Sequence, residues 1–233
     1  MKNLTIAPFL QNPPDGGMLY TETNMANFFP EPFNAITSCL FLALAIFWTV
    51  KLWGKGKKHT FLSIAVLLLY VGGIGGTIYH GLRQWGFFIM MDWLPIMLLC
   101  IAAGVYFLGK LTRWYYTLAM VVAYFVFQFY ARSKMMQGDI QLFININYAV
   151  LAGIVLLPVA GYLIKTGFKN GLWVISALIA FILALTFRVA DGWMWLSIGT
   201  HFLWHVFGSV AAFCMFQYIY LLNTDITPVK EKI

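Results

Sequence analysis

Seven apolar stretches of roughly 20 residues each occupy most of this 233-residue chain. A helix needs about 20 consecutive apolar residues to cross the hydrocarbon core of a bilayer, where every backbone polar group must be bonded within the segment. Hydrophobic residues make up 61% of the chain and charged residues 10%, whereas a soluble domain has about 45–50% and about 25%. We therefore predict an all-α integral membrane protein, a bundle of seven transmembrane helices. The predicted spans are 33–53, 60–80, 87–109, 113–131, 142–164, 171–188 and 199–222.

The distribution of basic residues predicts which side of the membrane each loop faces. Cytoplasmic loops carry an excess of Lys and Arg. One set of loops, together with the C-terminal tail, holds ten basic residues, and the opposite set, together with the N-terminal segment, holds five. We predict an outer-side N-terminal segment over 1–32, a transmembrane domain over 33–222 and a cytoplasmic tail over 223–233. The N-terminus shows no cleavable signal, so the first span is expected to act as an uncleaved signal anchor of this multi-pass protein.

Charge and cysteine content exclude several other classes of protein. The net charge of +7 does not indicate nucleic-acid binding, because no soluble domain carries it as a basic stripe. The three cysteines are odd in number and form no Cys-x-x-Cys, so neither a disulfide framework nor a thiolate zinc site is expected. Nothing in the sequence indicates an oligomeric state.

Three histidines and one aspartate lie within or at the ends of the predicted spans: His80, Asp92, His201 and His205. An aspartate within an apolar helix costs about 2.5–3.5 kcal/mol on insertion scales, so such a residue needs a partner and marks a functional site by default. His80 ends the second span, Asp92 begins the third, and the other two histidines begin the seventh. Because the spans alternate in direction, all four residues are predicted to lie toward the outer side at similar depth.

The spacing of the histidines predicts a metal site. His201 and His205 are four residues apart on one helix face, where two imidazoles can bind one ion, and His80 is the natural third ligand. Three neutral imidazoles leave a zinc ion with an open position, as catalytic sites do. Asp92 would hold a water there and move its proton, or bind the ion directly; the residue types leave both open. Histidines that are merely interfacial are the plainer alternative, and His59 is excluded because it lies in the basic cytoplasmic loop.

Four short motifs spread over most of the chain match one known family in order and in span placement. They are Glu31-Pro32-Phe33-Asn34, Tyr79-His80, Asp92-Trp93-Leu94-Pro95 and His201-Phe202-Leu203-Trp204-His205. In these motifs the chain resembles the alkaline ceramidases, within a wider superfamily that also includes the progestin and adiponectin receptors. The resemblance implies zinc bound by the three histidines, with Asp92 acting on the catalytic water. It also implies a membrane lipid substrate, ceramide or another N-acyl lipid, whose amide bond is hydrolysed to a sphingoid base and a fatty acid.

The chain departs from that family at the second span. The family has a serine four residues before the span's histidine, where it helps to stabilise the oxyanion, but this chain has Gly76. Thr77 or Ser38 are the candidates to replace that hydroxyl. A missing donor would remove about 2.7–4 kcal/mol of transition-state stabilisation.

A second departure concerns calcium. Family members with a calcium site use acidic and amide groups just before the first span, and hard cations prefer such oxygen ligands. Glu22, Asn24 and Glu31 are the candidate calcium ligands here, although the family's preceding aspartate is replaced by Leu19 or Tyr20. The plainer interpretation is a polar outer tail in which Glu31 caps the first span.

Other functions remain to be weighed against a zinc amidohydrolase. The main alternative is a seven-helix lipid-binding receptor or sensor with a structural zinc. A haem-binding electron carrier is disfavoured, because His201 and His205 share one helix face and cannot approach opposite faces of a ring. A transporter is disfavoured by the lack of inverted repeats and of paired broken helices.

Overall fold

The computed structural model describes residues 12–135 and 140–224, and within them the chain is all-helical. Each of the seven α-helices is long and apolar enough to cross a membrane, which confirms the predicted fold class and spans. The predicted tail lies outside the described residues after Thr224, and the N-terminal segment is described from residue 12. The helices are α1 (Pro32–Leu52), α2 (Thr60–Leu82), α3 (Gly86–Leu111), α4 (Trp114–Met135), α5 (Ile140–Lys165), α6 (Gly171–Ala190) and α7 (His201–Thr224), with a short 3-10 helix η2 (Asp191–Trp193) before α7.

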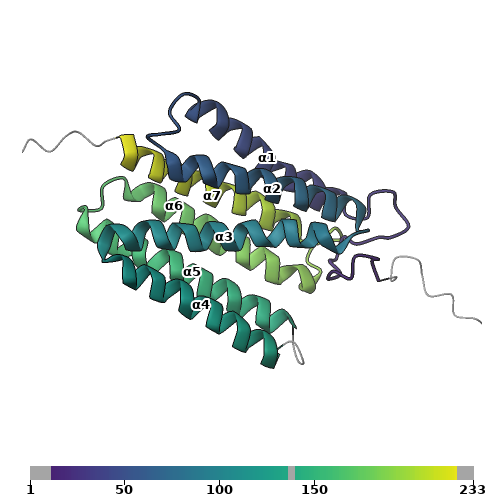
Figure 1. Cartoon of the computed structure of the whole chain (residues 1–233). Coiled ribbons are helices and arrows are strands. Elements are labelled where there is room, and N and C mark those ends of the chain that lie inside the picture. Colours follow the sequence, from purple (N-terminus) through teal and green to yellow (C-terminus); the bar gives the residue numbers. More distant parts are fainter. Residues whose placement is uncertain (1–11, 136–139, 225–233) are drawn as a thin grey trace, which may run out of the picture. The chain divides into compact units, whose positions relative to one another are not determined.

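The chain divides into two compact units, one formed by residues up to Pro95 and from Asn170 onward, the other by Ile96–Lys169. In the first unit α1 packs against α2 and α7, and α6 packs against α7 (Figure 1). Ala177, Ala180 and Ala184 form the buried face of α6. Small side chains at such a face let two helix backbones approach closely, which is how helices associate where water supplies no driving force.

Glycines on α2 permit a second close approach. A methyl group added at Gly73 would lie 2.8 Å from side-chain carbons of Leu42 on α1, and one added at Gly75 would lie 2.7 Å from the carbonyl carbon of Met91 on α3. Gly76 faces the same stretch of α3. Gly75 and Gly76 thus let α2 approach α3 closely at Met91 and Asp92, in the turns before His80.

The second unit contains α3 from Ile96 onward, α4 and α5. Its core is centred on Ile101, Tyr124 and Leu151, one residue from each helix. Gln128 on α4 donates hydrogen bonds to the Tyr124 hydroxyl (2.6 Å) and to the amide oxygen of Asn147 on α5. Amide side chains bonded across two helices contribute to association within an apolar medium.

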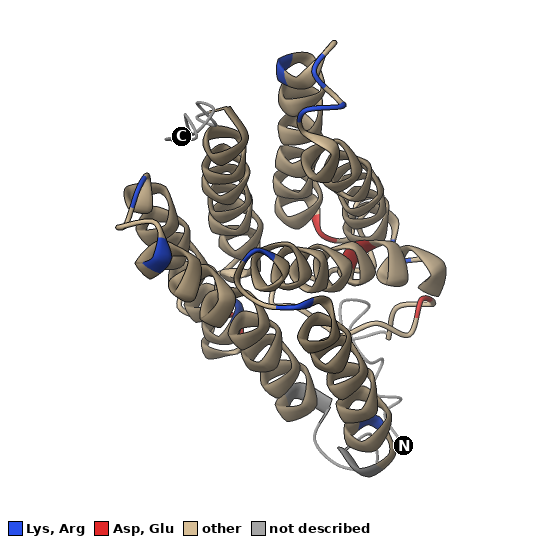
Figure 2. Ribbon diagram, turned by 60° about the vertical axis from the view of Figure 1, so that its left-hand side comes forward, with Lys and Arg blue, Asp and Glu red and all other residues tan. Residues whose placement is uncertain are grey.

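The outer faces of α1 and α2 are apolar. Ile36, Val50 and Leu67 are 68%, 70% and 63% exposed, as suits side chains that face lipid. In this helix pair the Lys-rich connecting loop stands at one end and the acidic residues at the other (Figure 2). This polarity is of the kind used to predict orientation, and which end faces the cytoplasm stays a prediction.

Substitution of Gly75 tests the α2–α3 contact. A methyl group there meets backbone atoms of Met91, which cannot move independently of α3. We expect Gly75→Ala to lower the free energy of unfolding by about 1–3 kcal/mol, the typical effect of overpacking. Gly153→Ala on α5 is the matched control, because a methyl group there meets nothing within 4 Å. Thermal unfolding in detergent measures both, and equal stability of the two variants would contradict the described contact.

Candidate metal centre

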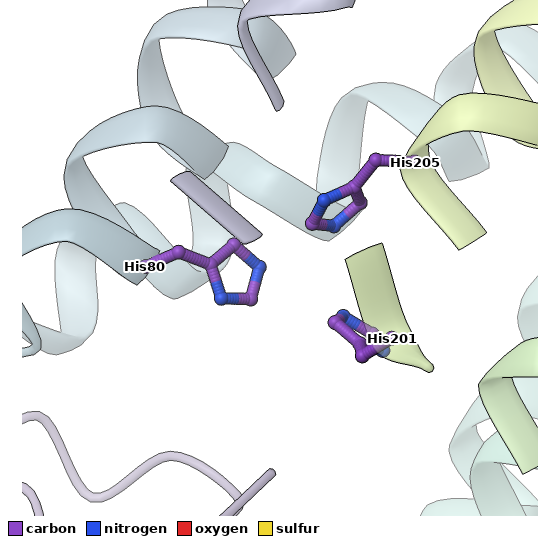
Figure 3. A group of neighbouring side chains, drawn as sticks. All are labelled: His80, His201 and His205. Carbon is purple, nitrogen blue, oxygen red and sulfur yellow. The ribbon is translucent and has the colours of Figure 1, made fainter. Parts of the chain in front are cut away.

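Three buried histidines from two helices converge on one point. His80 lies in the last turn of α2, and His201 and His205 occupy the first two turns of α7. Their exposed fractions are 0%, 4% and 2%, and one ring nitrogen from each lies within 4.8 Å of the other two. Figure 3 shows the three rings turned toward a common centre. Among the described residues this is the group able to hold a metal ion, and it consists of the three histidines predicted from the sequence.

The hydrogen bonds of two rings decide which nitrogen faces the centre. Nδ1 of His80 lies 2.5 Å from Oε2 of Glu31, and Nδ1 of His205 lies 3.1 Å from the carbonyl oxygen of Asn34. A carbonyl only accepts, as does an ionised carboxylate, so each Nδ1 carries the proton and each Nε2 keeps its lone pair. Both Nε2 atoms are buried without a hydrogen-bond partner in the described structure. Metal-binding histidines typically have this arrangement, with the second nitrogen donating to an oxygen.

His201 is held by a different set of contacts. Its ring stacks on that of Tyr20, with centroids 3.9 Å apart, and its buried Nδ1 has no hydrogen-bond partner among the described residues. Oδ1 of Asp191 accepts hydrogen bonds from the backbone N–H groups of Thr200 (2.7 Å) and His201 (2.9 Å), while Oδ2 accepts one from Thr21 (2.9 Å). A carboxylate at a helix N-terminus is stabilised by the free N–H groups there. Asp191 therefore fixes the start of α7 and with it the position of His201.

Asp92 lies beside the α2 turn that precedes His80. A methyl group added at Gly76 would lie 2.5 Å from Oδ1 of Asp92 and 3.1 Å from Oγ of Ser38. The glycine at position 76 thus leaves room for the Asp92 carboxylate. The structure brings Asp92 to the helical turn next to the three histidines without placing it within their group of mutually close ligand atoms.

The two candidate hydroxyls have different surroundings. Ser38 is buried, donates to the Asn34 carbonyl oxygen (2.9 Å) and lies 3.3 Å from Nδ1 of His205. Thr77 donates to the Gly73 carbonyl oxygen of its own helix (2.7 Å) and otherwise meets the exposed Cys39, 3.4 Å from its sulfur. Of the two, Ser38 is therefore the one beside the candidate metal centre.

The candidate calcium ligands have other partners. Glu22 caps α1, its carboxylate accepting hydrogen bonds from the backbone N–H groups of Phe33 (2.5 Å) and Asn34 (2.9 Å). Asn24 accepts a bond from the backbone of Ala26 at 3.1 Å. Glu31 occupies the N-cap position of α1 as expected, but its side chain makes no capping hydrogen bond, and Glu22 supplies those bonds instead. A calcium site at these residues stays a prediction.

Electrostatics distinguish the two glutamates. Burial by itself would raise the pKa of Glu31, but the hydrogen bond to His80 and the charge of Arg83 hold that pKa below its ordinary value. Burial raises the pKa of Glu22 despite its backbone hydrogen bonds. Glu31 is thus kept as an ionised acceptor for His80 by its neighbours.

Several residues of the centre had no signal in the sequence. Asp191 lies ten positions before His201, outside any capping spacing, and its contact with Thr21 spans 170 positions. Nothing in the sequence assigned Tyr20 or Arg83 to the metal centre. A buried ion pair between distant segments leaves no periodicity by which it can be found.

Comparison with protein-family models gives no match, and comparison with curated proteins gives none either. The resemblance to alkaline ceramidases therefore stays a prediction. The structure by itself establishes a coarser result: seven helices fit to cross a membrane carry a buried group of histidines that could hold a metal.

Metal content and affinity test this centre. We expect about one divalent metal per chain, measured by mass spectrometry, and its loss in His205→Ala. Glu31→Gln removes the ionised acceptor behind His80 and should weaken metal affinity about 10–100-fold in a chelator competition. His59→Gln is the control, because His59 is also a buried histidine but lies at the opposite end of α2. Equal metal loss in the His59 and His205 variants would count against the assignment.

Proposed function

We propose that this chain is an intramembrane zinc-dependent amidohydrolase that cleaves ceramide or a related N-acyl lipid. The observation that carries the proposal is the pair of imidazole Nε2 atoms with free lone pairs beside the third histidine, one helical turn from the Asp92 carboxylate. Together these groups form a metal site with a proton acceptor next to it. The substrate class comes from the resemblance of the four motifs.

The residues present fit a zinc ion. Three neutral imidazoles leave one coordination position open, the pattern of catalytic rather than structural zinc. When bound, zinc supplies the Lewis acidity that polarises the amide carbonyl and lowers the pKa of water. Asp92 takes the proton of the attacking water and passes it to the amide nitrogen as the C–N bond breaks and the new C–O bond forms. The products are a fatty acid and a sphingoid base.

The depth of the centre suits a lipid amide. The three histidines lie in the last turn of α2 and the first turns of α7, near the ends of two candidate spans. The amide of an N-acyl lipid sits between its hydrocarbon chains and its head group, near the membrane surface. Both chains of such a substrate would stay among the apolar faces of the helices while the amide reaches the histidines.

A lipid-binding receptor or sensor with a structural metal is the second candidate. The near-complete burial of all three histidines, with Tyr20 stacked over His201, favours it, since a structural metal needs no access for substrate. The two functions differ in one respect that an assay detects, which is turnover.

Asp92→Asn separates these functions. We expect fatty-acid release from ceramide to fall by about 10²–10⁴-fold, the usual contribution of a general acid–base, while zinc stays bound. His205→Ala should lose both zinc and activity. Zinc retained in the wild type without release from any member of a panel of N-acyl lipids would favour the receptor instead.

A pair of hydroxyl variants tests which side chain stands in for the family's serine. The Ser38 hydroxyl lies beside His205 and Gly76 and is free to rotate from Asn34 toward a substrate oxygen, so we expect Ser38→Ala to lower kcat by about 10²-fold. Thr77→Val removes a hydroxyl bonded to its own helix and should leave kcat essentially unchanged. Steady-state kinetics with ceramide decide between them, and the reverse order would exclude Ser38.

A further inference from the structure

Arg83 is a fully buried cation directly behind the metal centre. It follows the last turn of α2 in a left-handed conformation (φ 53°), where its backbone N–H donates to the Tyr79 carbonyl (2.9 Å). Its guanidinium donates to both oxygens of Asp15 (2.8 and 3.2 Å), to the carbonyl oxygen of Met18 (2.9 Å) and to Oε1 of Glu31. Arg83 thus joins the N-terminal segment to the residue before α1.

The guanidinium and the metal centre share one carboxylate. Oε1 of Glu31 accepts from Arg83, and Oε2 of the same side chain accepts from Nδ1 of His80. Both side chains of the Arg83–Glu31 pair are 0% exposed. The guanidinium thus fixes the carboxylate whose second oxygen accepts from Nδ1 of His80.

The surroundings of Arg83 resemble those of a bound cation. Two carboxylates and a backbone carbonyl are the oxygen ligands that a hard metal ion prefers. Of the candidate calcium ligands, Glu31 alone belongs to this set, in which the chain's own side chain supplies the positive charge. The Tyr79 ring, 4.7 Å from the guanidinium carbon, covers the cation.

We propose that Arg83 is a positioning residue of the metal centre: its guanidinium binds one oxygen of Glu31 and so holds the other oxygen in place to accept from Nδ1 of His80, which leaves Nε2 to face the centre. The proposal rests on the proposed metal centre but not on the identity of the substrate. Without the guanidinium, the Glu31 carboxylate loses one of the partners that fix its position. The His80 ring is then held less firmly by the oxygen behind it, and removal of such an oxygen typically weakens metal binding.

The test is zinc affinity, measured by chelator competition on the full-length protein in detergent. We expect Arg83→Ala to weaken zinc binding about 10–100-fold, the effect typical of removing a support behind a ligand. Guanidinium ion at millimolar concentration should restore affinity in this variant, because it refills the space lined by Asp15, Glu31 and Met18. The exposed Arg113 gives the matched control, Arg113→Ala, which should bind zinc as the wild type does and show no response to guanidinium.

A double-mutant cycle separates this role from a purely structural one. If Arg83 acts through Glu31, Arg83→Ala should change zinc affinity little once Glu31→Gln is present, whereas a general loosening of the fold would add to it. Arg83→Gln keeps an amide donor near the position of Nε but lacks the charge and the outer nitrogen that bonds Glu31, and it serves if the alanine variant does not fold. Unchanged affinity in the folded arginine variant, or additive effects in the cycle, would overturn the proposal.

The outcomes also distinguish failure of the proposed hydrolase function from failure of the proposed role of Arg83. Wild-type protein that binds no zinc overturns the metal centre and this inference together. Zinc affinity that depends on Arg83, in a protein that hydrolyses no N-acyl lipid, would support the inference and contradict the proposed hydrolase function. Zinc affinity that is unchanged by substitution of Arg83 would overturn the inference but would not affect the proposed hydrolase.

Discussion

The hydrogen bond between Nδ1 of His80 and Oε2 of Glu31 is the interaction on which the rest of the centre depends. It links the end of α2 to the residue before α1, and it fixes the ring tautomer that leaves a lone pair at Nε2. A buried carboxylate is stable only with compensating charge and hydrogen bonds, which Arg83 and Thr23 supply. Such a network stabilises only when every member is satisfied, so its parts are energetically coupled.

The N-terminal segment connects the helix ends that surround the centre. Asp15 contacts Arg83 after α2, Glu22 caps α1, and Thr21 binds Asp191 ahead of α7. Three helix ends that carry or flank the histidines are therefore tied to one stretch of chain. Packing of apolar side chains by itself would let the helices shift along their axes relative to one another. These polar contacts fix the relative positions of the helices. The price of placing charges near hydrocarbon is offset by a fixed geometry at the centre.

The spans and the histidine triad were predictable from the sequence because both rest on local or alternating patterns. Apolar length defines each helix. Because successive spans alternate in direction, the end of the second span and the start of the seventh lie on one side of the membrane. The sequence therefore predicts that His80, His201 and His205 lie together. The partners of those histidines could not, because Glu31, Arg83 and Asp191 act across tens to hundreds of positions. Glu22 and Glu31 show the limit clearly: both precede α1, and only the folded path of the segment decides that Glu22 caps the helix while Glu31 turns to His80.

The number of ligands bears on whether the centre catalyses or only stabilises. Structural zinc is almost always held by four protein ligands, and in the described residues the close group contains three, all imidazoles. The Glu31 carboxylate accepts from Nδ1 of His80, and the Asp92 carboxylate faces Gly76; neither belongs to the close group. A serine or alanine at position 76 would displace the Asp92 carboxylate, so the glycine and the aspartate are best understood together. Three imidazoles with a carboxylate beside the neighbouring helical turn are the groups that the proposed hydrolase would use, and that role would account for an aspartate in an otherwise apolar helix.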